Sequence, residues 1–347
     1  MKKLSMLVAV VMLAVLALSS CSSYEPNEVV YVYNWGEYID SSVNEKFEKE
    51  TGIKVIYDEY DNNESMYATL KNGAAKYDVI FPSDYMVARL IEEDMLEPLN
   101  FDNIPNYQYI MDRFKGLEYD PGNEYSVPYM WGIIGLLYNK DYVTETPDSW
   151  FALWDERYSG KTLMYNNSRD ALGITLIKNG GDVNTTDTSE LDAAAEDVKT
   201  LKKNLQAFVS DEIFNLMESG SAYIAPAYGG DALTMMEENS SLDYVIPEEG
   251  TNLFVDAICV VKGSKNKEAA EKYIDFLCRE DIAALNRDEI CYSTPQQQVY
   301  DNLENDVKNE LIAYPTDEIL DKSQVYTNLP KDTLDYYTSL WTDIKNS

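Results

Sequence analysis

The sequence of 347 residues contains no histidine. Histidine is the commonest general base in enzymes and the commonest ligand of transition metals. Its absence argues against Ser-His-Asp and Cys-His catalysis, and against zinc or iron sites built from histidine. Catalysis by carboxylates alone stays open. We therefore expect a protein without catalytic residues, metal or cofactor.

Cysteine is also scarce, with four residues at positions 21, 259, 278 and 291. None of the spacings is the CxxC pattern of metal sites, so a cysteine-built metal site is not expected. One pair among Cys259, Cys278 and Cys291 could form a disulfide, but a third thiol would then be left over. Free buried cysteines are the favoured interpretation.

Basic residues are also scarce: the sequence has 28 basic and 61 acidic residues, which gives a net charge of −33. A nucleic-acid partner is excluded by this balance, because phosphate binding requires a basic face. The field of the protein instead suits a cationic ligand. Alternatively, the acidic surface serves solubility alone.

Long apolar runs are absent except at the start of the chain, where residues 7–18 follow Lys2 and Lys3. A basic start, a short apolar segment and a small-residue cleavage site are typical of a secretory signal peptide. The run is short for a membrane span. Cys21 matches the bacterial lipobox pattern, so we predict a signal peptide over 1–20, lipidation of Cys21 and a tether over 21–27. An ordinary signal peptide or a short anchor helix is the alternative.

Strand and helix patterns alternate after the tether. Strands are predicted over 28–33, 53–57 and 77–81, with helices beginning near Ser42, Ser65 and Met86. This order predicts a parallel α/β sheet, whose ligands bind beyond the carboxyl ends of the strands. Trp35 and Ser83 each follow a strand, so we expect them to meet at one cleft. Later elements are predicted as strands over 133–138, 162–165, 223–227 and 257–262, and as helices over 192–208 and 267–277.

Five stretches carry a resemblance to a known family. They are Tyr33-Asn34-Trp35-Gly36-Glu37-Tyr38-Ile39, Phe47-Glu48-Lys49-Glu50-Thr51-Gly52-Ile53-Lys54-Val55, Tyr77-Asp78-Val79-Ile80-Phe81-Pro82-Ser83, Val127-Pro128-Tyr129-Met130-Trp131-Gly132 and Tyr292-Ser293-Thr294-Pro295. Over nearly all of the mature chain, the sequence resembles the spermidine/putrescine-binding lipoproteins of bacterial ATP-driven (ABC) polyamine importers.

This resemblance implies an α/β fold of the two-lobed periplasmic-binding-protein type (type II), with a ligand cleft between the lobes. Lobe 1 is expected over 28–132 and 257–300, and lobe 2 over 133–256 and 301–347. The implied function is capture of a polyamine outside the cytoplasm by a monomer. The monomer would be anchored by lipid in the periplasmic space or on the outer face of the cell membrane. It would deliver its ligand to a membrane permease. It would not be an enzyme.

The resemblance also implies the ligand contacts, and their chemistry is coherent by itself. Ammonium groups need carboxylates, and methylene chains need flat apolar walls that also attract cations. The expected carboxylates are Glu37, Asp170, Asp231 and Asp256; the expected aromatic walls are Trp35, Tyr85, Tyr228 and Phe254; the further contacts are Tyr38, Ser83, Asn167, Tyr292 and, on a loose alignment, Tyr326. The neighbouring Arg169 is expected to point away.

Structural roles compete with these assignments. Ser83, Asp170 and Asp231 could each cap a helix, Asp256 could cap a crossover strand, and Trp35 could be a core residue. Asn167 stands where many triamine-binding relatives have an acid, which predicts a weakened preference for triamines and retained putrescine binding. Tyr228 and Phe254 stand where many relatives have tryptophan.

Two other functions compete with polyamine binding. A binding lipoprotein could take a sugar or an amino-acid derivative, although converging carboxylates suit neither well. A secreted carboxylate-dependent hydrolase would need two acids at a fixed separation in the cleft.

Overall fold

The computed structural model describes residues 28–73 and 76–347. The predicted signal peptide, Cys21 and the tether therefore lie outside the described residues. Within the described ranges, no helix combines the length and apolar character that a membrane span requires.

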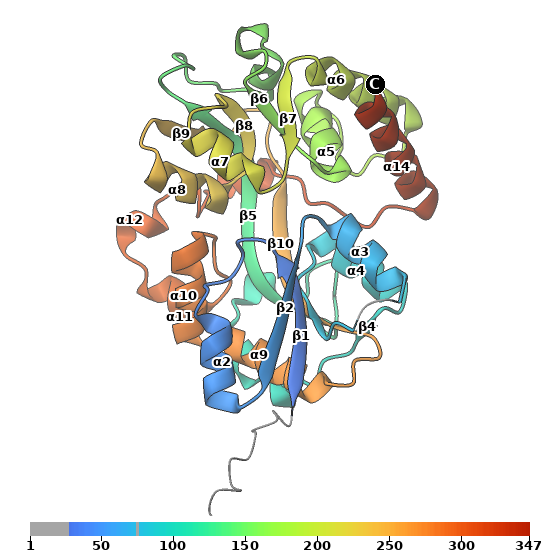
Figure 1. Ribbon diagram of the computed structural model, residues 1–347, viewed down its shortest axis with the longest axis vertical. Helices are drawn as coiled ribbons and strands as arrows, with labels where there is room; N and C mark the ends of the chain where they lie inside the picture. Colours follow the sequence, from blue (N-terminus) through green and yellow to red (C-terminus); the bar gives the residue numbers. More distant parts are fainter. Residues whose placement is uncertain (1–27, 74–75) are drawn as a thin grey trace, which may run out of the picture.

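The lower lobe in Figure 1 is built on parallel strands. Strand β1 (Val29–Trp35) lies between β2 (Lys54–Tyr60) and the short β3 (Val79–Ile80), and both pairings are parallel. Helices α2 (Val43–Thr51), α3 (Asn63–Lys71) and α4 (Asp84–Glu92) follow the three strands in turn. The predicted parallel sheet is thus confirmed.

Gly52 ends α2 with a left-handed φ of 76°, a conformation that glycine adopts readily at helix C-termini. At its other end α2 begins at Val43, directly after Ser42, which agrees with the predicted start near Ser42.

Two long strands join the lobes. Strand β5 (Ser126–Asn139) is buried along its whole length, and β10 (Leu253–Val261) pairs antiparallel with its first half. The second half of β5 pairs with β8 (Ile224–Tyr228) and β9 (Leu242–Val245) in the upper lobe. Figure 1 shows both strands running between the lobes, so a single sheet continues from one lobe to the other.

The upper lobe repeats the α/β pattern. Strand β6 (Thr162–Tyr165) lies between β7 (Leu205–Val209) and β8, parallel to both. Its helices are α5 (Ser168–Lys178), α6 (Thr188–Lys202), α7 (Glu212–Glu218), α8 (Gly229–Glu238) and the C-terminal α14 (Lys331–Asn346).

The predicted helix over 192–208 is wrong at both ends. Helix α6 begins at Thr188, where the side chain of Asp187 accepts a hydrogen bond from the backbone N–H of Ser189. It ends at Lys202, and residues 205–209 form β7 instead. This segment pairs with β6, and that tertiary contact overrides the local helical pattern.

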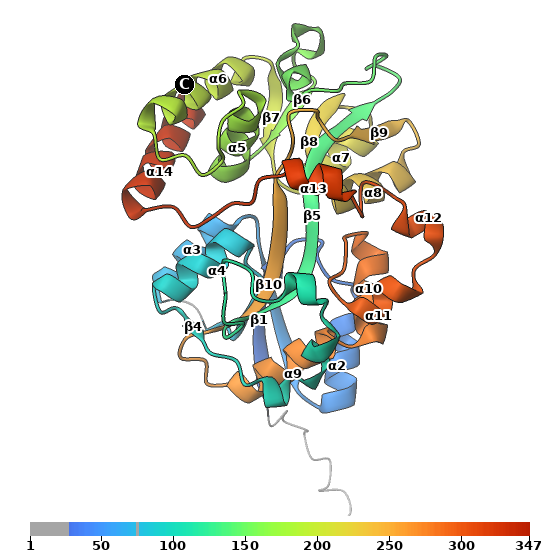
Figure 2. The same ribbon diagram turned by 180° about the vertical axis from the view of Figure 1, so that it is seen from behind.

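The remaining elements complete the two lobes. They are β4 (Leu96–Glu97), α9 (Lys267–Leu277), α10 (Glu280–Ile290), α11 (Gln297–Asn302), α12 (Asn305–Lys308) and α13 (Asp317–Lys322), with 3-10 helices at Phe101–Asn103, Pro105–Tyr109, Asp112–Phe114, Trp150–Trp154 and Glu156–Tyr158. Figure 2 shows the C-terminal part of the chain passing from α12 through α13 and up to α14 on the back of the molecule.

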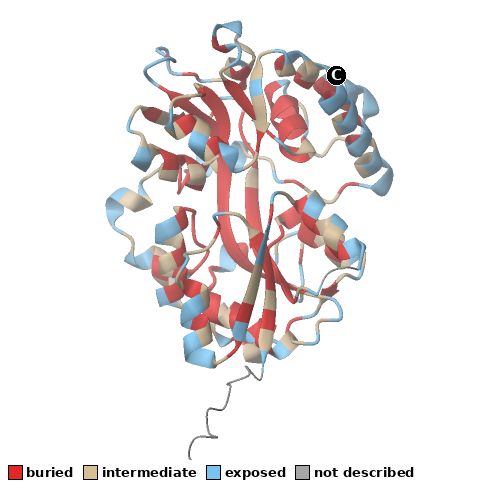
Figure 3. Cartoon of the chain, viewed as in Figure 1, coloured by how far each residue is buried: buried red, intermediate tan, exposed pale blue. Residues whose placement is uncertain are grey.

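The core follows the continuous sheet. Figure 3 shows the central strands as the most deeply buried part of the chain, with exposed residues on the outer faces of the helices. Cys259, Cys278 and Cys291 are free thiols, and the first two are buried. The interpretation as buried free thiols is confirmed for Cys259 and Cys278, whereas Cys291 is half-buried.

Candidate ligand-binding site

A cavity of about 100 Å³ lies between the lobes, where the carboxyl ends of several strands meet. All thirteen ligand contacts predicted from the sequence line it: Trp35, Glu37, Tyr38, Ser83, Tyr85, Asn167, Asp170, Tyr228, Asp231, Phe254, Asp256, Tyr292 and Tyr326. The fold thus brings together residues that are up to 291 positions apart in the sequence. Their contact with a ligand stays a prediction.

Trp35 is the last residue of β1 and is half-buried beside the cavity. Its indole Nε1–H donates a hydrogen bond of 2.7 Å to the carbonyl of Phe81, and the hydroxyl of Tyr60 donates to the same carbonyl at 2.6 Å. These bonds fix the orientation of both rings at the end of the sheet. Glu37 lies two residues beyond Trp35 with a left-handed φ of 49°, an uncommon conformation that is often found at functional sites.

Asp256 lies in the middle of β10, at a bulge in its pairing with β5, and forms an isolated bridge with Ser83. It is therefore no strand cap. The hydroxyl of Tyr38 donates a hydrogen bond of 2.7 Å to Oδ2 of Asp256. The other oxygen, Oδ1, is buried without a donor in hydrogen-bonding geometry among the described residues. Burial raises the pKa of Asp256 to about 6, although Ser83 and Tyr38 oppose the shift.

Asp170 lies in the first turn of α5. The cap of this helix is Asn167, whose Oδ1 accepts from the backbone N–H of Asp170, so Asp170 is not the capping residue. The amide of Asn167 also donates to Oδ2 of Asp170 at 2.7 Å, and the hydroxyl of Tyr228 donates to the same oxygen at 2.5 Å. Burial raises the pKa of Asp170 above its ordinary value, and these donors oppose the shift.

Asp231 lies in the first turn of α8, beyond the capping position, which Tyr228 occupies. The hydroxyl of Tyr292 donates to Oδ1 of Asp231 at 2.7 Å. Burial raises the pKa of Asp231 to about 7, and the negative charge of Asp211 adds to the shift. A carboxyl with this pKa is partly protonated near neutral pH, and a bound cation would favour its ionised form.

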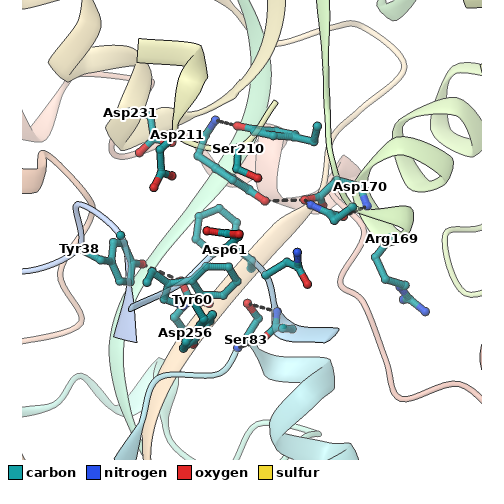
Figure 4. A pocket seen from close by; sticks show the side chains of 18 of the residues that line it. Tyr38, Tyr60, Asp61, Ser83, Arg169, Asp170, Ser210, Asp211, Asp231 and Asp256 are labelled. Carbon is teal, nitrogen blue, oxygen red and sulfur yellow. Dashed lines mark hydrogen bonds between the residues drawn. The ribbon is translucent and has the colours of Figure 1, made fainter. Parts of the chain in front are cut away.

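Aromatic rings from both lobes line the space between these carboxyl groups (Figure 4). Tyr165 and Tyr228 stack with ring centroids 4.7 Å apart, and Phe254 meets Tyr228 edge-on at 5.3 Å. Tyr38 and Tyr292 pack edge-on at 5.0 Å. These rings offer flat apolar walls beside the acids, a combination that suits methylene chains and cations.

Sequence reasoning missed several residues that line the cavity, namely Tyr60, Asp61, Asn62, Asn63, Glu64, Asp84, Tyr165, Ser210, Asp211, Phe214 and Asn252. Tyr60 ends β2 and residues 61–64 directly follow it, so the strand-end rule applied to Trp35 would have found this segment. Ser210 and Asp211 directly follow β7 and were hidden by the mistaken helix over 192–208.

The cavity is strongly acidic. Its lining contains eight acidic residues and one basic residue: Glu37, Asp61, Glu64, Asp84, Asp170, Asp211, Asp231 and Asp256, with Arg169. Burial raises the pKa of Asp84 to about 8. In Figure 4, the guanidinium group of Arg169 points away from the carboxyl group of Asp170, as expected from the sequence. A cavity of this kind favours a ligand that brings positive charge.

Known proteins provide an independent comparison. Residues 43–316 match the family model of the bacterial extracellular solute-binding protein. The chain is 35% identical over 309 residues to the spermidine/putrescine-binding periplasmic protein of Salmonella typhimurium, covering 88% of both chains.

Solved structures show the same relationship. A protein described as a spermidine/putrescine ABC transporter, from Listeria monocytogenes, superposes with a TM-score of 0.89 at 37% identity, covering 92% of this chain and 99% of that one. The PotD lipoprotein of Treponema pallidum superposes with a TM-score of 0.80 at 28% identity, covering 91% of this chain and 99% of that one.

These comparisons confirm the two-lobed α/β fold and the resemblance to spermidine/putrescine-binding proteins that the motifs predict. The chain belongs to the family of bacterial extracellular solute-binding proteins.

Proposed function

We propose that this protein captures a polyamine and delivers it to the membrane permease of an ABC importer. The observation that carries the proposal is the buried carboxyl group of Asp256, whose Oδ1 has no donor in hydrogen-bonding geometry among the described residues and which lies in a cavity lined by aromatic rings. A buried acceptor without a partner is unfavourable, and an ammonium group would supply the missing hydrogen bonds.

The charge of the cavity favours a cationic ligand over a sugar or an amino-acid derivative. Burial raises the pKa values of Asp231 and Asp256 to about 7 and about 6, and no cation among the described residues opposes the shift. A ligand with ammonium groups would return both carboxyls to their charged state, whereas a neutral sugar would not. The named functions of the similar proteins from Salmonella typhimurium and Listeria monocytogenes agree with this choice.

The cellular location is part of the same proposal. Cleavage after residue 20 would leave Cys21 as a lipid-bearing N-terminus, and the segment 21–27 would tether the protein outside the cytoplasm. Similarity to the PotD lipoprotein of Treponema pallidum supports this. We further propose that the protein acts as a monomer and a binding protein, not as an enzyme.

We also propose that the ligand is held between lobe 1 (28–132 and 257–300) and lobe 2 (133–256 and 301–347). Predicted contacts come from both parts, so closure of the lobes would complete the site. Strands β5 and β10 cross between the lobes and would act as the hinge.

Titration calorimetry with putrescine, cadaverine, spermidine and spermine tests the function. We expect saturable binding of at least one of them below millimolar concentration at physiological salt. A parallel thermal-shift panel with sugars and amino acids serves as the control, because a ligand at 100 times its Kd adds about 2.7 kcal/mol of stability. If only a non-polyamine raises the Tm, the proposal is wrong.

A further inference from the structure

A second cavity lies on the opposite face of strand β10 from the proposed polyamine site. Its volume is about 530 Å³, against about 100 Å³ for the polyamine cavity. Phe254 and Asp256 line the polyamine cavity, whereas Leu253 and Val255 line the second one. Side chains alternate between the two faces of a strand, so β10 forms a wall between the two cavities. We call the second one the rear cavity.

The rear cavity is lined by residues of both proposed lobes. Phe114, Leu117 and Tyr119 come from lobe 1, and Leu320 of α13 and residues 325–328 come from lobe 2. Figure 2 shows the chain between α13 and α14 crossing the long strands on the back of the molecule. The proposed capture of polyamines does not use this space. Its aromatic and aliphatic side chains suit the apolar body of a small ligand.

Trp131 brings an unsatisfied hydrogen-bond donor to the rear cavity. It lies opposite Val255 in the pairing of β5 with β10, so the two side chains share a face of the sheet, and both line the rear cavity. Trp131 is 2% exposed, and its indole Nε1–H is buried without an acceptor among the described residues. A buried donor without an acceptor is unfavourable, and an acceptor on a ligand would supply the missing hydrogen bond.

Arg113 places a positive charge beside this donor. Its guanidinium carbon lies 4.9 Å from the ring centroid of Trp131 and 4.8 Å from that of Phe114. The side chain lines the rear cavity, and it makes no hydrogen bond or ion pair within the described ranges. Two donors, one of them charged, thus lie close together without an acceptor, and a carboxylate is the group that satisfies such a pair.

Two acids also line the rear cavity, and neither opposes an anionic ligand strongly. Both oxygens of Asp84 accept hydrogen bonds from backbone N–H groups, at 2.7 Å from Tyr85 and at 3.2 Å from Val255. Burial raises the pKa of Asp84 to about 8, so this carboxyl is mostly uncharged at pH 7. Glu118 is exposed, where water and salt screen its charge.

We propose that the rear cavity is a second ligand site, which binds an aromatic carboxylic acid with its carboxylate at Arg113 and Trp131 and its rings among the apolar side chains. This site is separate from the polyamine cavity, but a ligand in it would act on that cavity. Rotation about β5 and β10 that parts the lobes at one cavity brings them together at the other. An occupant of the rear cavity therefore holds the lobes closed over the polyamine site and raises the affinity for polyamines.

Calorimetry with diphenylacetate tests the site on the unmodified protein, because this probe combines two rings with one carboxylate. We expect saturable binding below millimolar concentration without any polyamine. Diphenylacetamide has the same shape without the charge, and should bind about tenfold more weakly. Failure of diphenylacetate to bind would overturn the inference.

The same probe tests the coupling between the two cavities. Saturating putrescine should tighten the binding of diphenylacetate, and diphenylacetate should tighten the binding of putrescine by the same factor. Mutual competition would place the probe in the polyamine cavity and overturn the inference. Equal affinities with and without putrescine would overturn the coupling. If no polyamine binds, the proposed function is wrong, and the probe by itself still decides whether the rear cavity is a ligand site.

Substitution of Arg113 locates the carboxylate of the probe. Arg113→Met keeps the length of the side chain and its apolar contact with the rings, and should weaken diphenylacetate about tenfold while leaving diphenylacetamide unchanged. Putrescine affinity without the probe should also stay unchanged. Arg157 gives the matched control, because its guanidinium carbon lies 5.5 Å from the ring centroid of Tyr158 and it does not line the rear cavity. Arg157→Met should change neither affinity.

A second variant blocks the rear cavity itself. Val325 lines it and is 42% exposed, so Val325→Trp should fill part of the space and abolish the binding of both diphenylacetate and its amide. If both Arg113→Met and Val325→Trp bind diphenylacetate as tightly as the unmodified protein, the probe binds elsewhere and the inference is overturned. If thermal unfolding shows that one variant does not fold, the other variant decides.

Discussion

Asp256 is the residue on which ligand binding should depend most directly. Within the described chain, Oδ1 of its buried carboxyl group accepts no hydrogen bond. A bound ammonium group would supply this missing hydrogen bond and balance the negative charge. We predict that Asp256→Asn weakens polyamine binding tenfold or more, about 1.4 kcal/mol. The Tm without ligand should stay nearly unchanged, because the lost charge is not paired within the described chain. Calorimetry and thermal unfolding of the variant measure the two effects.

Asp78 offers a matched control in the same lobe. It is 2% exposed, and its oxygens accept hydrogen bonds from the backbone N–H of Tyr31, the hydroxyl of Ser264 and the amide of Asn266. Asp78→Asn should lower the Tm and leave affinity unchanged. The opposite pattern, with Asp256→Asn unstable but still binding, would make Asp256 a structural residue.

The raised pKa values also predict a pH dependence of binding. Burial raises the pKa values of Asp231 and Asp256 to about 7 and about 6, and a bound ammonium group would lower both. Binding must therefore release protons in this range, and affinity should fall as the pH falls from 8 to 5.5. Calorimetry at pH 6.5 in two buffers with different ionisation enthalpies measures the released protons. Identical apparent enthalpies would contradict this coupling.

At the scale of elements, the turn from β8 into α8 depends on a close approach between a glycine and a ring. A Cβ atom at Gly230 would lie within 2.6 Å of three carbons of the Tyr292 ring. We predict that Gly230→Ala displaces this ring, breaks its hydrogen bond to Asp231 and weakens binding about tenfold or more.

Gly181 provides the control for this substitution. Its Cβ would meet no atom closer than 3.4 Å, so Gly181→Ala should change neither affinity nor Tm appreciably. Calorimetry measures the polyamine affinity of both variants. If Gly230→Ala folds normally and binds polyamines with unchanged affinity, the position of the Tyr292 ring is not needed for binding.

Most elements could be predicted because local pattern and tertiary structure agree. The apolar segments at β1 and β3 are strands in a sheet with parallel pairing, as their sequences indicate. The segment 205–209 could not be assigned locally, because the residues of β6 with which it pairs lie 43 or 44 positions earlier in the chain. That error also concealed Ser210 and Asp211 from the predicted site.

At the scale of the whole molecule, anchoring and ligand capture should be independent. The predicted lipid site at Cys21 precedes the first described strand, and the cavity is formed by residues from Trp35 onward. We predict that Cys21→Ala moves the protein from the membrane fraction to the soluble fraction and leaves polyamine affinity unchanged. Fractionation followed by calorimetry tests both parts. A variant that stays in the membrane fraction would indicate a retained helix in place of a lipid.

The sequence by itself determined the chemistry of this protein. The excess of acids favoured a cationic ligand, the strand-end positions of Trp35 and Ser83 predicted a cleft, and the resemblance to polyamine-binding proteins implied the carboxylates and rings that line it. Only the tertiary structure decided which acids are available to a ligand. From the sequence, Asp170 and Asp256 were both predicted to be carboxylates that bind a cation. In the fold, Oδ2 of Asp170 accepts hydrogen bonds from Tyr228 and Asn167, whereas Oδ1 of Asp256 has no donor among the described residues. Hydrogen bonding depends on distances of about 3 Å between residues far apart in the chain, and these distances exist only after the lobes have packed together.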